Sequence, residues 1–186
     1  MHPYCNYVKG IQDKKDVDKI YHDKYYGVPI RDDNELFCRL VMEINQAGLS
    51  WHTILVKENN FRKAYHNFDI KKVAKYNERD FARLMNDPGI IRNRLKINAA
   101  IYNAQQLMVI QKEYGSFRKW LDVEDRKLKV EGGKNSDSKA SWLRLFKKNF
   151  KFVGGEIVGE FLMSIDMLPN SHGEECLRYK KLKKRN

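Results

Sequence analysis

The chain has 186 residues, of which 42% are apolar, enough for the core of one domain or of two small, closely packed ones. This composition excludes a disordered chain, and no apolar run approaches the roughly 18 residues that a membrane-spanning helix needs. The opening MHPYCNYVKG lacks the apolar core of a signal peptide. We therefore expect a soluble intracellular protein.

The charge is strongly positive, with 36 Lys and Arg against 24 Asp and Glu and a net charge of +12. The last nine residues, RYKKLKKRN, carry six of the positive charges. Such an excess favours a polyanionic partner, nucleic acid first, because phosphate contacts release counterions. A lysine-rich composition with a merely solubilising tail fits the charge equally well.

The first predicted helix lies in DDNELFCRLVMEINQAG. Asp32 and Glu35 have the spacing of a capping box, and Gly48 is a typical residue to end a helix. The apolar residues between them recur every three or four positions, which is the period of a helix buried along one face.

The next two predicted helices are joined by a tight hairpin. NERDFARLMNDPG starts with Asn77 as a cap and breaks at 87–89, and the helical apolar spacing that follows continues to Gly115. No alternating strand pattern competes, so the predicted fold class is all-α. Further helices are expected at 117–121, 139–148 and 155–166, and an exposed loop or a boundary between subregions at 125–138 (DRKLKVEGGKNSDS).

Glu43 lies at the edge of the buried face of the first helix. At about 100° per residue it falls only about 20° from Leu36. A buried ionised carboxylate is costly unless something pairs with it. One interpretation is a salt bridge within the chain, or a side chain that reaches solvent; the other is a pocket that receives a positively charged ligand.

Cysteine and histidine residues near the two ends of the chain suggest a metal site. His172 and Cys176 are four residues apart in HGEEC and share a face if that segment is helical, while Cys5 and His22 supply one more of each type. Such a Cys2His2 set has the number and softness of a closed tetrahedral zinc site. Spacing alone supports it weakly, because there is no CxxC pair. Three cysteines do not fit a secreted disulfide framework, and Cys38 is expected in the core.

Six segments carry a resemblance to a known family. In order and spacing, YHDKYYGVP, ELFCRLVMEINQAGLSWHTILVK, NFRKAYHNFDIKKVA, GIIRNRLKI, FKFVG and HGEEC resemble DNA-3-methyladenine glycosylase I, within the helix-hairpin-helix glycosylase superfamily. The resemblance implies a helix-hairpin-helix DNA glycosylase fold, with a single domain at 1–176 made of two closely packed helical subregions and a basic tail at 177–186.

The resemblance also implies that zinc joins the N- and C-terminal regions. The four positions that bind metal in the family correspond to two cysteines and two histidines of this chain. A filled four-ligand shell has no place for water, so the implied role is structural. The implied ligands are Cys5, His22, His172 and Cys176.

The chemistry of the family explains the carboxylate. A base methylated at N3 is cationic, so its glycosidic bond is weak and its ring attracts negative charge. Family members flip this base into an aromatic pocket, where a glutamate accepts hydrogen bonds from the base edge, a tryptophan stacks and a tyrosine hydroxyl adds a contact. The matching positions are Glu43, Trp51 and Tyr21. Glu43 is the expected catalytic residue, acting as a binder and electrostatic stabiliser.

DNA contacts are implied at two segments. Gly48 and Leu49 are expected to enter the space beside the flipped nucleotide and limit its restacking. In the hairpin DPGIIRNR, Gly89 lets the backbone approach a phosphate, and Arg92 and Arg94 add positive charge.

The mechanism is expected to be monofunctional. Most of the superfamily places an activating aspartate after the hairpin, but no aspartate occurs between Asp87 and Asp122. A lyase step through a lysine Schiff base has no lysine at a matching site. We therefore expect water to attack the anomeric carbon while the charge of the leaving base drives cleavage.

This chain departs from the family around the pocket. Tyr7 and Tyr26 stand where tryptophans are typical, and Asp18 stands where a tyrosine is common. Gly159 and Glu160 replace larger or less charged residues. These changes predict a more polar pocket, or one shaped for a somewhat different base.

Two hypotheses from different classes remain. The first is an enzyme that removes 3-methyladenine from double-stranded DNA in base excision repair, working as a monomer in the bacterial cytoplasm at the nucleoid. The second is a zinc-stapled DNA-binding protein of the same fold that recognises lesions without cleavage. Retention of Glu43, Trp51 and Tyr21 favours the enzyme. A zinc-dependent hydrolase is disfavoured because all four ligands serve a structural site.

Overall fold

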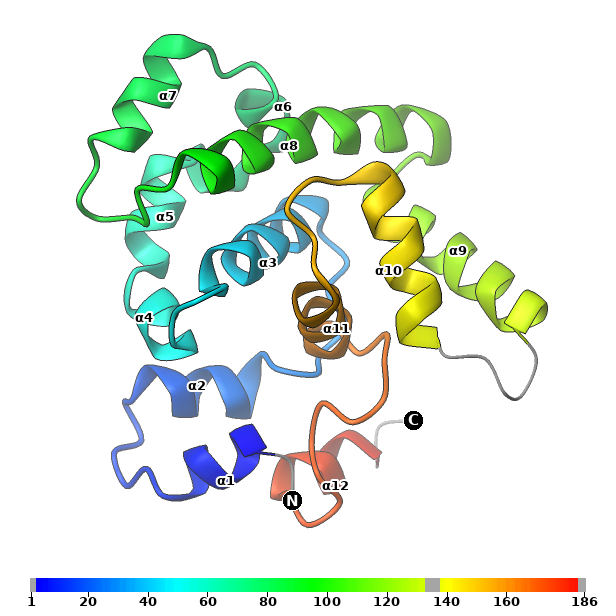
Figure 1. Cartoon of the computed structure of the whole chain (residues 1–186). Helices are drawn as coiled ribbons and strands as arrows, with labels where there is room; N and C mark the ends of the chain where they lie inside the picture. The colour runs from blue at the N-terminus through cyan, green and yellow to red at the C-terminus, as the bar shows by residue number, and fades with distance from the viewer. Residues whose placement is uncertain (1–2, 133–137, 184–186) are drawn as a thin grey trace. The chain divides into compact units, whose positions relative to one another are not determined.

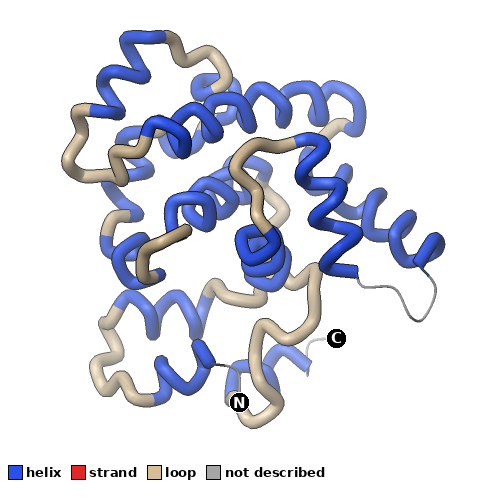
Figure 2. The backbone as a smooth tube through the Cα atoms, in the orientation of Figure 1, coloured by secondary structure: helices blue, strands red, loops and turns tan. Residues whose placement is uncertain are grey.

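The structure, a computed structural model, describes residues 3–132 and 138–183, and every regular element within those ranges is a helix (Figure 1, Figure 2). The expected all-α fold class is therefore confirmed. The chain divides into two compact units: the larger comprises Ile30–Phe161, and the smaller combines Met1–Pro29 with Leu162–Asn186. Among the described helices, none has both the length and the apolar character that a bilayer span requires.

Most of the helices belong to the larger unit. Its longest helix, α8, follows the hairpin after α7 and packs along α6 and α9 (Figure 1). In chain order the helices are α3 (Asp33–Gln46), α4 (Trp51–Val56), α5 (Glu58–Ala64), the 3-10 turn η1 (His66–Phe68), α6 (Ile70–Val73), α7 (Glu78–Met85), α8 (Arg94–Tyr114), α9 (Phe117–Gly132), α10 (Ser138–Asn149) and α11 (Gly155–Ser164).

An aromatic core joins α9, α10 and α11. Its rings pack edge to face, tilted or stacked, with neighbouring centroids 5.3–6.4 Å apart. Truncating one such buried ring to alanine typically costs about 3–5 kcal/mol, so the cluster fixes these helices firmly. Its members are Phe117, Trp120, Trp142, Phe146, Phe150 and Phe161.

Asp32 and Gly48 mark the two ends of α3 as predicted, but only half of the predicted capping box forms, because the Glu35 carboxylate binds Arg62. The Asp32 carboxylate accepts the N–H of Glu35 at 2.9 Å and caps the helix. The Glu35 carboxylate is bonded to the Arg62 guanidinium at 2.8 Å through both oxygens. Gly48 has φ of +82°, a left-handed conformation that favours glycine just after a helix.

The hairpin between α7 and α8 is also confirmed. Asn77 caps α7 in a full capping box with Asp80, and Asn93 caps α8. The longer helix ends at Gly115, with φ of +87°. The two helices thus begin and end close to the predicted residues because each boundary has a local chemical signal.

The expected loop at 125–138 is wrong over its first part, because α9 continues to Gly132. Ion pairs along the exposed side stabilise this extension: Lys127 contacts Glu124 at 2.7 Å, and Lys129 contacts Asp125 at 2.6 Å. The polar sequence at 125–130 therefore forms an exposed helix face. Residues 133–137 of the expected loop lie outside the described residues.

The smaller unit is built from both ends of the chain. It contains α1 (Pro3–Lys9), α2 (Val17–Lys24), the last turn of α11 and α12 (Leu177–Lys183). The Gly27 N–H donates to the Ser164 carbonyl at 2.9 Å, and a Cβ on Gly27 would lie 2.5 Å from Ser171 Oγ. Glycine at this position therefore allows the two chain ends to meet.

Candidate functional site

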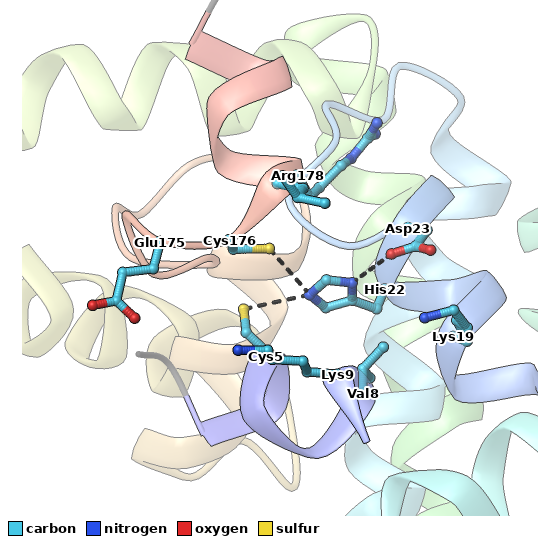
Figure 3. A pocket seen from close by; sticks show the side chains of 10 residues that line it. Cys5, Val8, Lys9, Lys19, His22, Asp23, Glu175, Cys176 and Arg178 are labelled. Atoms are coloured by element: carbon cyan, nitrogen blue, oxygen red, sulfur yellow. Dashed lines mark hydrogen bonds and ion pairs between the residues drawn. The ribbon is translucent and has the colours of Figure 1, made fainter. Parts of the chain in front are cut away.

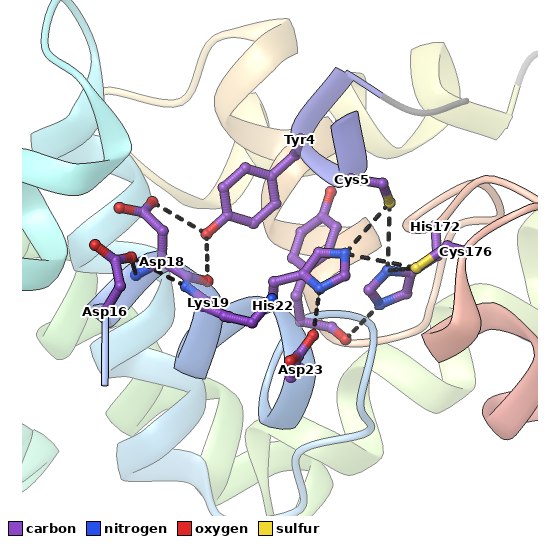
Figure 4. Close-up of polar contacts among 10 residues, drawn as sticks. Tyr4, Cys5, Asp16, Asp18, Lys19, His22, Asp23, His172 and Cys176 are labelled. Atoms are coloured by element: carbon purple, nitrogen blue, oxygen red, sulfur yellow. Dashed lines mark hydrogen bonds and ion pairs between the residues drawn. The ribbon is translucent and has the colours of Figure 1, made fainter. Parts of the chain in front are cut away.

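Four cysteine and histidine side chains converge in the smaller unit (Figure 4). Their ligand atoms all lie within 4.8 Å of one another, and all four residues are buried. The S···N separations are 3.3 Å (Cys5–His22), 3.6 Å (Cys5–His172), 3.7 Å (Cys176–His22) and 3.8 Å (Cys176–His172). Tetrahedral zinc with ordinary bond lengths requires about 3.6 Å between S and N. The residues therefore fit such an ion.

The chain brings these ligands together from three segments. Cys5 lies on α1 and His22 on α2, whereas α12 begins only at Leu177. The possibility that His172 and Cys176 share a helix face is not realised. A turn joins them instead, in which the Cys176 N–H donates to the Gly173 carbonyl at 2.8 Å.

Hydrogen bonds outside the cluster orient both imidazole rings. His22 Nδ1 lies 2.8 Å from the Asp23 carboxylate, and His172 Nε2 lies 3.0 Å from the Tyr26 carbonyl. Both oxygens only accept, so each of these ring nitrogens carries the proton. Nε2 of His22 and Nδ1 of His172 keep their lone pairs toward the sulfurs. Burial raises the pKa of the Cys5 thiol, a cost that a bound cation would offset.

A cavity of about 330 Å³ lies beside the cluster (Figure 3). Three of the four candidate ligands line it, together with basic side chains that include Lys9, Lys19 and Arg178. The cluster is thus reachable through this cavity, which supplies the entry path that a metal site needs.

Glu43 lies on α3 in the larger unit and is only 4% exposed. Burial raises the pKa of its carboxyl to about 8; the Arg39 charge lowers the pKa and the Glu160 charge raises it further. Arg39 therefore does not compensate for burial, which argues against a simple internal salt bridge. The balance leaves a carboxylate whose ionised form gains from an external cation.

The loop after α3 is defined by its own hydrogen bonds. The Leu49 N–H donates to the Gln46 carbonyl at 2.7 Å, and Gln46 Nε2 donates to the Leu49 carbonyl at 3.1 Å. Ser50 then caps α4 by accepting the N–H of Thr53 at 3.2 Å. Leu49 is 38% exposed at the tip, and Trp51 is the first residue of α4.

Tyr21 belongs to an aromatic group in the smaller unit. Its ring lies 6.2 Å from Tyr4 and 5.8 Å from Tyr26 between centroids, and it is 5% exposed. The Tyr4 hydroxyl contacts the buried Asp18 carboxylate at 3.2 Å, and Tyr7, stacked on Tyr4, is exposed. Tyr4 was missed by sequence reasoning, although its position beside Cys5 placed it near the predicted metal cluster. The shared role of Tyr21 with Glu43 and Trp51 stays a prediction.

The hairpin has a different hydrogen-bond pattern from the one expected. The Gly89 N–H already donates to the Asp87 carboxylate at 2.7 Å, and the Lys57 ammonium contacts the Pro88 and Gly89 carbonyls at 3.3 Å. A Cβ on Gly89 would lie 2.9 Å from Asp87 Oδ1 and 3.1 Å from Asn60 Cβ, so a larger residue here would require these neighbours to shift.

The two predicted arginines of the hairpin are exposed. Arg92 precedes the cap of α8, and the Arg94 guanidinium lies 5.0 Å from the centroid of the Phe81 ring. Their side chains are accessible to a polyanion, which is what the phosphate-binding prediction requires.

One family and two relatives that this chain resembles carry the name of the same activity. A family described as methyladenine glycosylase matches residues 11–179. DNA-3-methyladenine glycosylase 1 of Escherichia coli is 37% identical over 168 residues, which cover 86% of this chain and 89% of that protein. DNA-3-methyladenine glycosylase of Haemophilus influenzae is 34% identical over 167 residues, covering 84% and 89%.

Solved structures agree with these relatives. 3-Methyladenine DNA glycosylase I from Staphylococcus aureus, studied for its recognition of 3-methyladenine, has 31% identity and a TM-score of 0.79, covering 92% of this chain and 94% of that chain. A variant of 3-methyladenine DNA glycosylase I in complex with 3-methyladenine gives the same identity and TM-score, covering 92% and 95%.

Proposed function

Because the chain belongs to the methyladenine glycosylase family, we propose that it is a monofunctional DNA glycosylase that hydrolyses the N-glycosidic bond of 3-methyladenine in alkylated DNA. The observation that carries this proposal is the buried Glu43 carboxyl, whose raised pKa reflects the lack of sufficient internal compensation. A cationic base supplies the missing charge. The reaction belongs to base excision repair.

The proposed mechanism uses the charge of the leaving base. The damaged nucleotide leaves the duplex and enters the pocket, where Glu43 accepts hydrogen bonds from the base edge, Trp51 stacks on its face and the Tyr21 hydroxyl adds a contact. Water attacks the anomeric carbon, the bond to the base nitrogen breaks, and the water proton passes to solvent. Neutral adenine gains less from an anionic pocket, which gives selectivity without a strong catalytic acid.

In the metal site, Cys5, His22, His172 and Cys176 would hold zinc. The ion would supply structural stabilisation, because four protein ligands fill its tetrahedral shell. It would staple α1 and α2 to the 172–176 turn of the smaller unit.

Duplex DNA is the proposed partner. Leu49 and Gly48 would fill the space left by the flipped nucleotide, while Gly89, Arg92 and Arg94 would meet the phosphate backbone. The net charge of +12 favours this partner electrostatically. We propose that the protein works as a monomer, and that its basic tail adds nonspecific affinity.

The direct test is to incubate the purified protein with methylated duplex DNA and to measure the released bases by chromatography. We expect free 3-methyladenine above a protein-free control. Intact binding to the methylated duplex without any base release would contradict the enzyme and support a lesion-binding protein of the same fold.

The activity should rise with pH. Since the pKa of Glu43 is about 8 in the free protein, its ionised fraction grows roughly tenfold per pH unit below that value. The pH profile of kcat/KM reports groups of the free enzyme, so we expect a rise from pH 6 to a plateau above 8, and a flat profile for Glu43→Gln. A flat profile in the parent protein would contradict this assignment.

Metal affinity should depend on Asp23. Asp23→Asn weakens the acceptor that orients His22, and loss of such a partner typically lowers metal affinity about 10- to 100-fold. Competition with a chromophoric chelator measures the zinc dissociation constant. Asp13→Asn, which alters an exposed carboxylate of the same unit, is the matched control. Equal affinities for both variants would argue against this role.

A further inference from the structure

Lys96 is a buried lysine in the first turn of α8, with 5% of its surface exposed. Its ammonium donates to the Asn45 carbonyl at 2.9 Å and to the Ala47 carbonyl at 2.7 Å. Desolvation lowers the pKa of Lys96. A buried ammonium bonded to backbone carbonyls is unusual, because lysines are seldom buried unless paired.

The two acceptors mark the end of α3. The last carbonyls of a helix have no intrahelical donors and form the negative end of its dipole, so a cation there is stabilising. Lys96 holds the carbonyls on both sides of Gln46, and Gln46 in turn exchanges two hydrogen bonds with Leu49. The Lys96 bonds and the Gln46–Leu49 bonds, joined by the backbone of residues 45–47, thus link α8 to the exposed Leu49.

The other side of Lys96 adjoins the hairpin. The Asn93 side chain, which caps α8 directly after the hairpin, accepts the Lys96 backbone N–H at 3.1 Å. The Phe152 ring, which follows α10, lies with its centroid 5.8 Å from the ammonium. Phe152 has φ of +58°, a strained conformation for a phenylalanine, so its place beside Lys96 is held by the surrounding structure. The ammonium therefore contacts two segments that are distant from Lys96 in the sequence, the end of α3 and the segment that carries Phe152.

We propose that Lys96 is a positioning residue that couples the DNA-binding hairpin to the loop carrying Leu49. This inference rests on the proposed function, because it assigns DNA contact to the hairpin and duplex opening to the loop. When the hairpin is seated on phosphates, the first turn of α8 is fixed, and Lys96 fixes the end of α3 and the loop relative to it. Lys96 itself does not touch the reacting atoms.

The test compares Lys96→Met with Lys112→Met, an exposed lysine near the other end of the same helix. On a duplex with 3-methyladenine opposite thymine, we expect the single-turnover excision rate of Lys96→Met to fall about 10-fold or more, since two charge-assisted hydrogen bonds are lost. The control should stay within about twofold, and affinity for undamaged duplex should change little in either variant.

A second substrate separates positioning from a general structural defect. When the lesion lies opposite an abasic site, the base is already poorly stacked, so base flipping depends less on insertion of Leu49. We expect the deficit of Lys96→Met to shrink on this substrate, whereas Glu43→Gln stays impaired on both. An equal loss on both substrates would overturn the coupling role.

A double-mutant cycle tests the link to the loop. If Lys96 acts through Leu49, Lys96→Met should cause little further loss in a Leu49→Ala background, and additive losses would contradict the inference. Should Lys96→Met melt below the assay temperature, Gln46→Ala weakens the same link at a partly exposed residue, because it removes the side-chain bond to the Leu49 carbonyl. Absence of base release by the parent protein would instead contradict the proposed function itself.

Discussion

Glu43→Gln is expected to lower the single-turnover rate of 3-methyladenine release by about 100-fold or more. Glutamine keeps the shape of the side chain and one acceptor oxygen, but it removes a negative charge from a site that is 4% exposed. Losing a preorganised electrostatic partner in such a site typically costs about 100- to 1,000-fold in rate. The measurement uses excess protein over a methylated duplex and chromatography of the released base.

The matched control is Glu113→Gln, which removes the same charge from an exposed position on α8. It should retain the parent rate.

Stability provides a second check. Because the pKa of Glu43 is raised in the folded protein, the neutral carboxyl favours folding and the ionised carboxylate opposes it. This contribution to stability is lost as the pH rises through about 8. Glu43→Gln should therefore melt no lower than the parent above pH 8. If Glu43→Gln were as active as the parent, Glu43 would have no role in base release.

Removal of the metal is expected to have the second-largest effect, a loss of thermal stability. Chelation, or Cys176→Ser, should lower the melting temperature by at least about 10 °C, because binding energy of a structural ion is folding energy and 1 kcal/mol shifts a chain of this size by about 2–4 °C. The measurements are thermal melts with and without chelator, and the zinc content per chain.

Cys38→Ala is the control for this experiment. Cys38 is buried in α3, outside the metal cluster, so the substitution destabilises the core but should leave the chelator-dependent drop intact. Cys176→Ser should show little further drop with chelator. A parent protein that binds no zinc and melts identically with chelator would refute the metal assignment.

Local signals made much of the larger unit predictable. Asp32, Asn77 and the glycines after α3 and α8 each end or begin a helix through bonds or backbone angles that depend on a few neighbouring residues. The helix at 125–132 was missed for the opposite reason. Residues 125–130 are mostly polar and none of them is buried, so no apolar periodicity indicated the helix. The shortest helices, such as α4 and α6, contain too few turns to show a period.

The candidate sites divide in the same way. Residue type drew attention to Glu43 and to the four Cys and His residues, because a carboxylate on a buried helix face and a Cys2His2 set are unusual combinations, and the family resemblance supplied their proposed roles. Lys96 and the Tyr26 carbonyl could not be identified, since their roles depend on which distant segments they meet. Asp23 had a weak signal as the neighbour of His22 in YHD.

The smaller unit takes its two halves from opposite ends of the chain, and this affects the order of events during synthesis. Cys5 and His22 leave the ribosome well before their partners, since Leu162 follows Pro29 by about 130 residues. At 5–20 residues per second this delay is on the order of 10 s. During this interval the larger unit can fold before all four proposed ligands have been synthesised. We expect tight metal capture to be a late step, which follows the synthesis of residues 172–176.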